Sequence, residues 1–311
     1  MNPEFSRWNR RTWLAVAAGG IASPWARAVT EFRRTGPPRL KLSLAAYSFR
    51  DFFVAQPGGR SGKPPAGKEM DMPGFLDFCA RHGCDGAELT SYYIPTPVTA
   101  EALMALRRQA FLSGVEVSGT AVGNTFTVPR GERRDGEIAS VKRWIEHAQT
   151  LGAPHIRVFA GNVEGTSPAE AKRLCIEALE ECGEVAGRAG VFLGIENHGG
   201  IVAEAADLLD IVKAVRSPWV GINLDSGNFH SDDPYADFAK CLPWAVNVQV
   251  KVELRRKGSK NEPSDLPRLV RSMQQAGYQG WVALEYEAAE DPYVAVPRYL
   301  EQLGSLMRVR V

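Results

Sequence analysis

From residue 40 onward the sequence alternates short apolar runs with longer stretches that have a helical pattern. Each run is at most eight residues long, is rich in Val, Ile, Leu or Phe, and is bounded by Gly, Pro or polar residues. Such runs are typical of buried strands. The eight expected strands are Leu40–Tyr47, Gly86–Thr90, Val115–Val122, His155–Ala160, Val191–Glu196, Val220–Asp225, Val246–Lys251 and Val282–Tyr286.

The stretches between the runs predict helices, for example over Pro168–Gly187, Ala203–Val215 and Leu266–Ala276. Ser167 directly before Pro168 is a helix-start signal of the usual kind. Strands that alternate with helices form a parallel sheet, and eight such units predict a closed (β/α)8 TIM barrel of the α/β class. A doubly wound sheet is the alternative, but no Gly-rich dinucleotide loop follows any expected strand.

Two segments interrupt this alternation. Asp51–Pro73, after the first strand, is rich in Gly, Pro and Lys and is too long for an ordinary connection. It is either a lid over the barrel mouth or a surface loop. Val252–Ser264, after the seventh strand, carries a cluster of basic residues and is either a solvated loop or an anion-contacting one. The basic residues are Arg255, Arg256, Lys257 and Lys260.

Polar side chains stand at the ends of the last four expected strands. These are Glu196, Asp225, Gln249 and Glu285. Alternation along a strand places all four on the inner face of the barrel, together with Lys251. A buried carboxylate is unfavourable unless it is paired or binds a cation. Three carboxylates and an amide in register on neighbouring strands therefore predict a bound divalent metal ion.

Three further polar residues have positions of interest. Glu88, which nearly ends the second strand, and Arg157 in the fourth strand share the inward alternation. They are expected either to line the pocket or to form a buried charge pair. His198 follows Glu196 closely and is expected to contact substrate or to support the metal site rather than to be a ligand.

Four motifs at these strand ends resemble those of the xylose isomerase-like TIM barrel superfamily, the sugar phosphate isomerase/epimerase family. They are Ile195–Gly200, Leu224–Asn228, Val248–Lys251 and Ala283–Tyr286. Weaker similarity extends over nearly all of residues 40–303. Members include ketose 3-epimerases, hydroxypyruvate isomerases and endonuclease IV. The resemblance is specific for the fold and the metal but not for the substrate.

The resemblance implies one divalent ion bound by Glu196, Asp225, Gln249 and Glu285. Gln249 stands where the family commonly has a His, so the ligand set contains only oxygen and favours Mn²⁺ or Mg²⁺, with Zn²⁺ and Co²⁺ as alternatives. Asn228 replaces a His that binds substrate in the epimerases, and Arg255 matches an arginine that contacts substrate there. The implied substrate-binding residues are Asn228, Lys251, Arg255, His198 and Glu88.

The chemistry that fits this site is proton abstraction next to a carbonyl through an enediolate, with Glu196 and Glu285 as the catalytic residues. Isomerisation and epimerisation of a sugar or keto-sugar begin with this step. A 3-keto-glycoside lyase or hydratase, which acts by β-elimination, shares it and is one alternative. A sugar-binding barrel without catalysis is another, because Gln249 and Asn228 depart from the family pattern.

The first residues predict a twin-arginine export signal over residues 1–28, a linker over 29–39 and the barrel over 40–311. The signal is indicated by Arg10-Arg11, by a short apolar run from Trp13 to Ala22, and by Ala26-Arg27-Ala28. The apolar run is too short to span a bilayer. Export to the periplasm disfavours sugar phosphates, which are largely intracellular, and favours a non-phosphorylated sugar.

Charge and cysteine content bear mainly on what the protein does not bind. The formal net charge is +1, from 37 basic and 36 acidic residues, so no basic surface for nucleic acid is expected. A small-molecule sugar is the expected partner, without membrane insertion, and homo-oligomer formation stays open. The five cysteines include no C-x-x-C pair and suggest no function.

Overall fold

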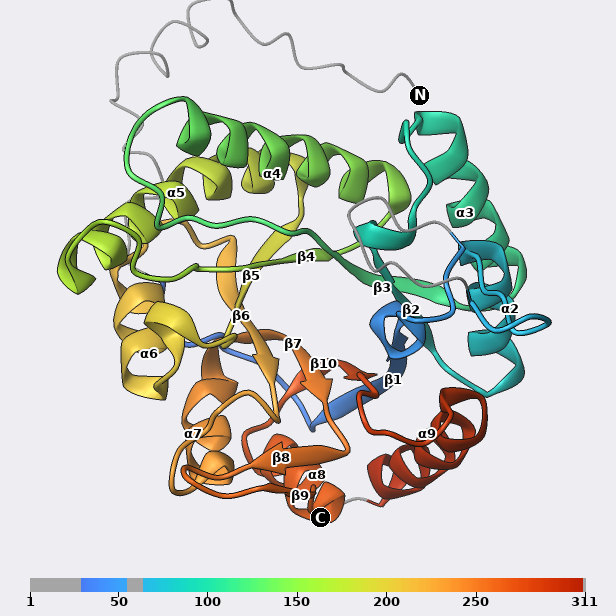
Figure 1. Ribbon diagram of the computed structural model, residues 1–311. Coiled ribbons are helices and arrows are strands. Elements are labelled where there is room, and N and C mark those ends of the chain that lie inside the picture. Colours follow the sequence, from blue (N-terminus) through green and yellow to red (C-terminus); the bar gives the residue numbers. More distant parts are fainter. Residues whose placement is uncertain (1–28, 55–63, 310–311) are drawn as a thin grey trace, which may run out of the picture.

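The computed structural model describes residues 29–54 and 64–309. Its parallel strands close into a barrel in the order β1-β10-β7-β6-β5-β4-β3-β2 (Figure 1). The doubly wound alternative is wrong, because β1 pairs with both β2 and β10 and the main sheet has no edge. The strands are β1 (Arg39–Ala45), β2 (Gly86–Thr90), β3 (Glu116–Ala121), β4 (His155–Val158), β5 (Phe192–Glu196), β6 (Val220–Asp225), β7 (Ala245–Val250) and β10 (Gln279–Leu284).

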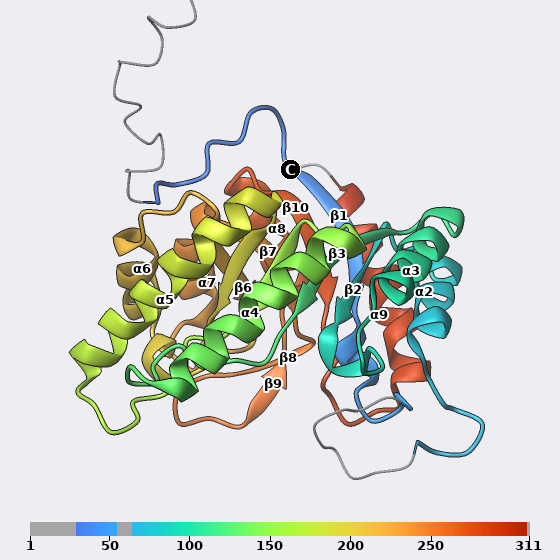
Figure 2. The ribbon, with the colours of Figure 1, turned by 90° about the horizontal axis from the view of Figure 1, so that it is seen from above.

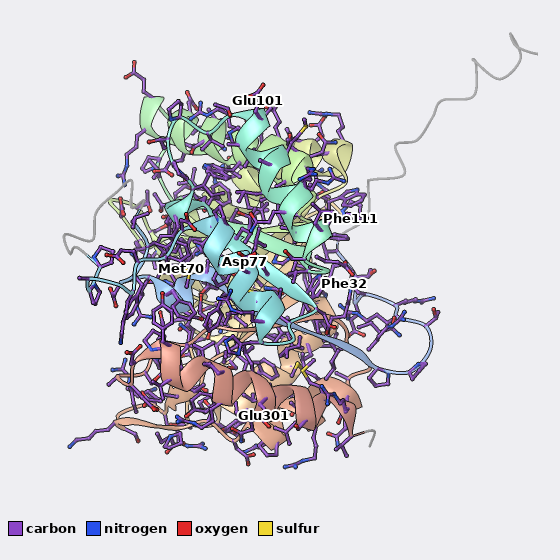
Figure 3. The ribbon with its side chains drawn as sticks, turned by 90° about the vertical axis from the view of Figure 1, so that its right-hand side faces the viewer. Phe32, Met70, Asp77, Glu101, Phe111 and Glu301 are labelled. Atoms are coloured by element: carbon purple, nitrogen blue, oxygen red, sulfur yellow. The ribbon has the colours of Figure 1, made fainter. Side chains whose placement is uncertain are left out.

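Helices surround the barrel, and Figure 3 shows one side, where α2 carries Asp77, α3 carries Phe111 and α9 carries Glu301. The start signal of α5 is confirmed, since the Ser167 side chain accepts a hydrogen bond from the Glu170 amide. No helix among the described residues is long and apolar enough to cross a membrane. The helices are α2 (Met72–Arg81), α3 (Ala100–Leu112), α4 (Glu132–Leu151), α5 (Pro168–Ala189), α6 (Ala205–Ala214), α7 (Pro234–Cys241), α8 (Leu266–Gln275) and α9 (Pro292–Arg308).

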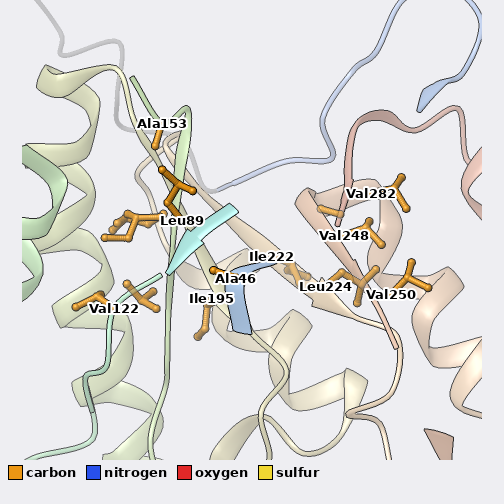
Figure 4. Close-up of a cluster of buried hydrophobic side chains, with 14 of the residues drawn as sticks. Ala46, Leu89, Val122, Ala153, Ile195, Ile222, Leu224, Val248, Val250 and Val282 are labelled. Carbon is orange, nitrogen blue, oxygen red and sulfur yellow. The ribbon is translucent and has the colours of Figure 1, made fainter. Parts of the chain in front are cut away.

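The main hydrophobic core lies between the strands and the surrounding helices. Figure 4 shows part of it, including Ile195, Leu224, Val248 and Val282, which are fully buried. Each of these residues alternates with an inward-facing residue of its strand. Because neighbouring side chains of a strand point to opposite faces, an apolar outer face leaves the inner face free to hold polar groups.

Five strands end one or two residues earlier than predicted, and β1 and β10 are two of them. β1 ends at Ala45 rather than Tyr47, because Ala46–Phe49 forms the 3-10 turn η1. β10 ends at Leu284, so Glu285 follows the strand. Both ends are joined by Ser48, whose hydroxyl donates to the Leu284 carbonyl and accepts from the Tyr286 amide. This turn fixes the backbone on both sides of Glu285.

Residues 29–38, expected as part of a linker, pack against the N-terminal end of the barrel. The Val29 amide donates to the Val215 carbonyl at 2.8 Å, and the Phe32 amide donates to the Pro243 carbonyl at 2.9 Å. A Cβ atom on Gly221 would lie 2.9 Å from the Phe32 ring, so the glycine makes room for it. The expected signal, residues 1–28, lies outside the described residues.

The opposite end of the barrel carries a small hairpin of β8 (Glu253–Arg255) and β9 (Asn261–Pro263), as Figure 2 shows. This hairpin is the segment after the seventh strand that was expected as a basic loop. In the other interrupting segment, Phe53 forms a bridge with Met70 and α2 begins before the segment ends. Residues 55–63 of that segment lie outside the described part of the chain. The expectation that the segment is a lid or a surface loop falls largely on these residues.

Candidate active site at the carboxyl ends of the strands

The four residues expected to hold a metal all lie at the carboxyl ends of β5, β6, β7 and β10, and all are buried. Glu196 ends β5, Asp225 ends β6, and Glu285 directly follows β10. Gln249 is in register with both Asp225 and Ala283. Their exposed fractions are 6% or less. The inward alternation predicted from the sequence therefore matches the structure at these four positions.

Two side chains contact Glu196, one at each of its carboxylate oxygens. Arg157 Nε lies 2.9 Å from Oε2, and Asn228 Nδ2 donates to Oε1 at 2.9 Å. Arg157 also donates to the Val122 carbonyl, and its guanidinium lies over the Phe159 ring. Burial raises the pKa of Glu196 above its usual value despite the nearby Arg157. The buried charge pair expected for Arg157 thus forms with Glu196 and not with Glu88.

Lys251 lies among three other carboxylates. Its Nζ is 3.4 Å from Asp225 Oδ2 and 3.1 Å from Glu285 Oε2, and it donates to Glu287 Oε2 at 2.5 Å. Burial alone would raise the pKa of Glu285, but Lys251 holds that pKa below its usual value. Lys251 itself has a pKa well above its usual value, because the carboxylates outweigh its burial. Lys251 therefore contacts site carboxylates directly and is not only a substrate-facing residue.

Gln249 and Glu88 are joined in a buried hydrogen-bond network. Gln249 Nε2 donates to Glu88 Oε1 at 2.8 Å and to Glu285 Oε1 at 3.3 Å, while its Oε1 accepts from Asn223 Nδ2. Asn247 donates to the other oxygen of Glu88. Burial, reinforced by Glu285, raises the pKa of Glu88 to about 8. As it lies, Gln249 presents nitrogen to the carboxylates, so a ligand role requires its amide to turn over.

Asp225 is the least well compensated carboxylate of the site. Its Oδ1 accepts from the Gly227 amide at 2.7 Å, but the fully buried Oδ2 has no hydrogen-bond partner among the described residues. Burial raises its pKa well above the usual value in spite of Lys251. A carboxylate oxygen buried without a donor is unfavourable, so this atom is the point of the site that most needs a cation.

The charges of the site do not balance. Four carboxylates (Glu196, Asp225, Glu285 and Glu287) face two cations (Arg157 and Lys251), so four minus two leaves two negative charges in excess when all are ionised. Within the described residues, no three His, Cys, Asp or Glu side chains lie close enough together to hold a metal ion as they stand. A divalent cation fits the charge excess and the oxygen donors, but the side chains would have to converge and Lys251 would have to move aside.

A cavity of about 190 Å³ opens beside Lys251 between the ends of β6 and β7 and the β8–β9 hairpin. Three expected substrate-binding residues, Asn228, Lys251 and Arg255, line it, together with His230 and Glu287. Arg255 contacts the His230 ring at 3.1 Å. The structure thus brings the hairpin and the carboxylates together around one small opening.

Two expected contacts lie elsewhere, and one residue was missed. His198 is exposed and lies against the Phe159 ring, 4.7 Å between centroids, and does not line the cavity. Glu88 lies below the cavity, in the network with Gln249. Glu287, which pairs with Lys251, was not predicted. Glu287 stands two positions after Glu285 and would share its inward alternation if the strand continued, but β10 ends at Leu284, so the pattern gave no firm signal.

A larger hollow of about 490 Å³ lies on the outside of the barrel, between α5 and the segment that leads into β6. It is lined by Gly183, Gly187, Arg216 and Trp219, among others. None of the expected site residues lines it. The chemistry that the sequence predicts is therefore confined to the carboxyl end of the barrel.

Comparison with known proteins agrees with this arrangement. The model of the family described as xylose isomerase-like TIM barrel matches residues 76–303. A protein of Streptomyces coelicolor named putative hydroxypyruvate isomerase is 26% identical over 225 residues, which cover 64% of this chain and 78% of that protein. A crystal structure of 3-keto-D-glucoside 4-epimerase from E. coli has a TM-score of 0.66 at 16% identity, and covers 86% of this chain and all of that one.

Two further structures with the same fold contain metal ions. A xylose isomerase-like TIM barrel protein from Mycobacterium smegmatis in complex with magnesium has a TM-score of 0.64 at 21% identity, covering 88% of this chain and 98% of that one. A protein named IOLI with a bound zinc atom has a TM-score of 0.65 at 17% identity, covering 86% and 96%. Two barrels of this architecture thus hold a divalent ion, magnesium in one and zinc in the other.

Proposed function

The chain belongs to the xylose isomerase-like TIM barrel family, and from this we propose that it is an isomerase or epimerase that acts on a sugar next to its carbonyl. The observation that carries the proposal is that the pKa values of two buried carboxyl groups are shifted in opposite directions. In the arrangement described, Lys251 lowers the pKa of Glu285, whereas burial raises the pKa of Glu196. Two carboxyl groups with opposed pKa shifts in one site are the arrangement that a paired base and acid require.

In this proposal Glu285 accepts the proton from the carbon next to the carbonyl, and Glu196 returns a proton to the intermediate. Arg157 and Asn228 fix Glu196 in one orientation, since each binds one of its two oxygens. In the arrangement described, Gln249 restrains Glu285 through the hydrogen bond from its Nε2, and this bond would be given up when the amide turns its oxygen toward a metal ion. Epimerisation returns the proton to the same carbon on its opposite face, whereas isomerisation adds it to the former carbonyl carbon and moves a hydroxyl proton to the former carbonyl oxygen. Both begin with the same abstraction by Glu285.

A divalent ion is the second part of the proposal, with Mn²⁺ or Mg²⁺ favoured over Zn²⁺ or Co²⁺. Glu196, Asp225, Gln249 and Glu285 would hold it, and the oxygen-rich donor set is the reason for the preference. The support is the gathering of four carboxylates around two cations, and the buried Oδ2 of Asp225, which accepts no hydrogen bond from the described residues and has the Lys251 ammonium 3.4 Å away as its counter-charge. When bound, such an ion would supply Lewis-acid polarisation of the substrate carbonyl.

The proposed substrate is a non-phosphorylated sugar or keto-sugar. The cavity of about 190 Å³ is small, and its lining mixes cationic and anionic side chains without a cluster of arginines for a phosphate. The putative hydroxypyruvate isomerase of Streptomyces coelicolor, a relative in sequence, supports a small carbonyl substrate. β-Elimination from a 3-keto-glycoside begins with the same proton abstraction and stays an alternative outcome.

Export through the twin-arginine route is also proposed, on the basis of Arg10-Arg11 and the apolar run that follows. Replacement of both arginines by Lys should leave the precursor in the cytoplasm. Unchanged export of that variant, measured by cell fractionation, would show that the pair is not an export signal.

The function is tested by incubating the protein with Mn²⁺ and a panel of keto-sugars and 3-keto-glycosides in heavy water. Deuterium uptake at the carbon next to the carbonyl, with an isomer or epimer as product, is the expected result. Uptake followed by loss of the glycosidic substituent would identify the lyase alternative. Sugar binding without any deuterium uptake would contradict catalysis and leave a sugar-binding barrel.

A further inference from the structure

Lys251 and a divalent metal ion would require the same carboxylate oxygens. The ammonium group lies 3.4 Å from Asp225 Oδ2 and 3.1 Å from Glu285 Oε2. Both residues are in the proposed ligand set, and Lys251 is the only cation that the described residues place against them. A cation held at this distance repels a second one strongly in a buried site, so the two cannot occupy the same position.

The protein backbone is shaped to hold Lys251 there. The Lys251 amide donates to Ser226 Oγ at 2.9 Å, which fixes the start of the side chain. A Cβ atom on Gly227 would lie 2.9 Å from Lys251 Cδ and 3.0 Å from its Cβ, so this glycine leaves room for the side chain. The lysine is only 9% exposed. The position of Lys251 is therefore determined by the residues packed around it, unlike that of a lysine in a solvent-exposed ion pair.

Glu287 is a further carboxylate with which the Lys251 ammonium pairs. It accepts a hydrogen bond from Nζ and is more exposed than the other two partners, at 34% of its side chain against 0% for Asp225 and 8% for Glu285. It also lines the cavity, whereas Asp225 and Glu285 do not. A small rotation of the lysine toward Glu287 would free the two buried carboxylates and keep the ammonium paired.

We propose that Lys251 is a resident cation that competes with divalent metal for Asp225 and Glu285, and that Glu287 receives it when the metal binds. The proposal rests on the metal site of the proposed function. It assigns a function to the counter-charge that Lys251 gives Asp225 and Glu285 in the arrangement described. It also predicts that the affinity for the metal depends on Lys251 and Glu287 together.

The experiment is a titration of purified, metal-free protein with MnCl₂ alone, in which free Mn²⁺ is followed by electron paramagnetic resonance. Lys251→Met keeps the length of the side chain and removes its charge, so we expect Mn²⁺ to bind about tenfold or more tightly than in the unaltered protein. Lys260→Met, at the exposed end of the hairpin, removes the same charge away from the carboxylates and should leave the affinity unchanged.

Glu287→Gln should act in the opposite direction and weaken Mn²⁺ binding several-fold, because the displaced lysine loses its partner. In the Lys251→Met background the same change should have little effect, since there is then no displaced lysine for Glu287 to bind. This double-mutant cycle separates the proposal from a general effect of charge, which would make the Glu287→Gln loss equal in both backgrounds.

Equal or weaker Mn²⁺ binding by Lys251→Met would overturn the competition, and so would an unchanged affinity of Glu287→Gln. If the unaltered protein binds Mn²⁺ but Lys251→Met binds it no better, the metal site of the proposed function stands and only the role of Lys251 is lost. If neither binds Mn²⁺, both the competition and the metal site are wrong, and deuterium uptake then decides separately whether the carboxylates are catalytic.

Discussion

Two groups of polar side chains in the barrel interior differ in charge, and Glu88 and Gln249 link them through hydrogen bonds. The mouth cluster lies at the carboxyl ends of the strands and comprises Arg157, Glu196, Asp225, Lys251 and Glu285. The lower group lies nearer the starts of the strands and comprises Ser43, Ser118, His155, Asn223 and Asn247. All ten residues are buried, so burial alone does not distinguish a site from a polar core.

The lower group consists of neutral side chains. Ser43 and Ser118 share a hydrogen bond of 2.6 Å, and Asn247 donates to Asn223 at 2.8 Å. His155 is neutral, because burial lowers its pKa to about 4. Atoms without a hydrogen bond occur in both groups, but those of the lower group are on neutral side chains, whereas Oδ2 in the mouth cluster belongs to the Asp225 carboxyl group and lies 3.4 Å from the Lys251 ammonium. A neutral atom without a hydrogen bond costs far less than a charged one, so this contrast is a reason to propose the mouth cluster as the functional site.

The largest effect expected from this contrast belongs to Glu285. Replacement by Gln keeps an oxygen and a similar shape but removes the proposed base, so turnover should fall by about 10²–10⁴ while Mn²⁺ remains bound. Turnover on the sugar identified by deuterium uptake and Mn²⁺ binding by magnetic resonance are the two measurements. A fully active variant with metal bound would show that another group takes the proton, and the enediolate mechanism would have to be abandoned.

The sequence predicted which side chains share the barrel interior, because the inward alternation along a strand depends only on position. It also identified the family and the strand ends that carry the site. It did not predict which charges pair. The ion pair between Arg157 and Glu196 depends on strand order and stagger, since Arg157 is in register with Gly194, next to Glu196 on the same face of β5.

The second limit of prediction from the sequence concerns the direction of long side chains. Alternation places Lys251 inside the barrel, but a lysine with four rotatable bonds can point to substrate or back to the carboxylates, and only packing against Gly227 decides. The same holds for Gln249, whose amide can present oxygen or nitrogen to its neighbours. Glu287 was missed because it lies beyond the strand, where the alternation is no longer assured.

In the lower group, His155 should make stability depend on pH. Its pKa is about 4 in the folded protein and 6.5 without burial, so the unfolded chain binds more protons between these values. Stability is therefore lost as the pH falls from 6.5 toward 4, by about 3 kcal/mol for this group alone. Between pH 7 and pH 4.5, His155→Gln should lose about 2–3 kcal/mol less than the unaltered protein in urea unfolding. An equal loss in both proteins would show that His155 is not held neutral.

The smallest expected effect separates the two groups most sharply, and it concerns the hydrogen bond between Ser43 and Ser118. Both hydroxyls are fully buried, so Ser43→Ala leaves its partner unpaired and should lower the free energy of unfolding by about 1–2 kcal/mol. Adding Ser118→Ala should cost less than a second loss of that size, because no unpaired hydroxyl is then left. Neither residue contacts the mouth cluster through a hydrogen bond or ion pair that the described residues form, so turnover should stay within about twofold in both variants. Urea unfolding and turnover, measured on the single and double variants, check both statements. A tenfold loss of turnover in Ser43→Ala would mean that the lower group positions the catalytic carboxylates, and the separation of the barrel interior into a neutral core and a charged site would not hold.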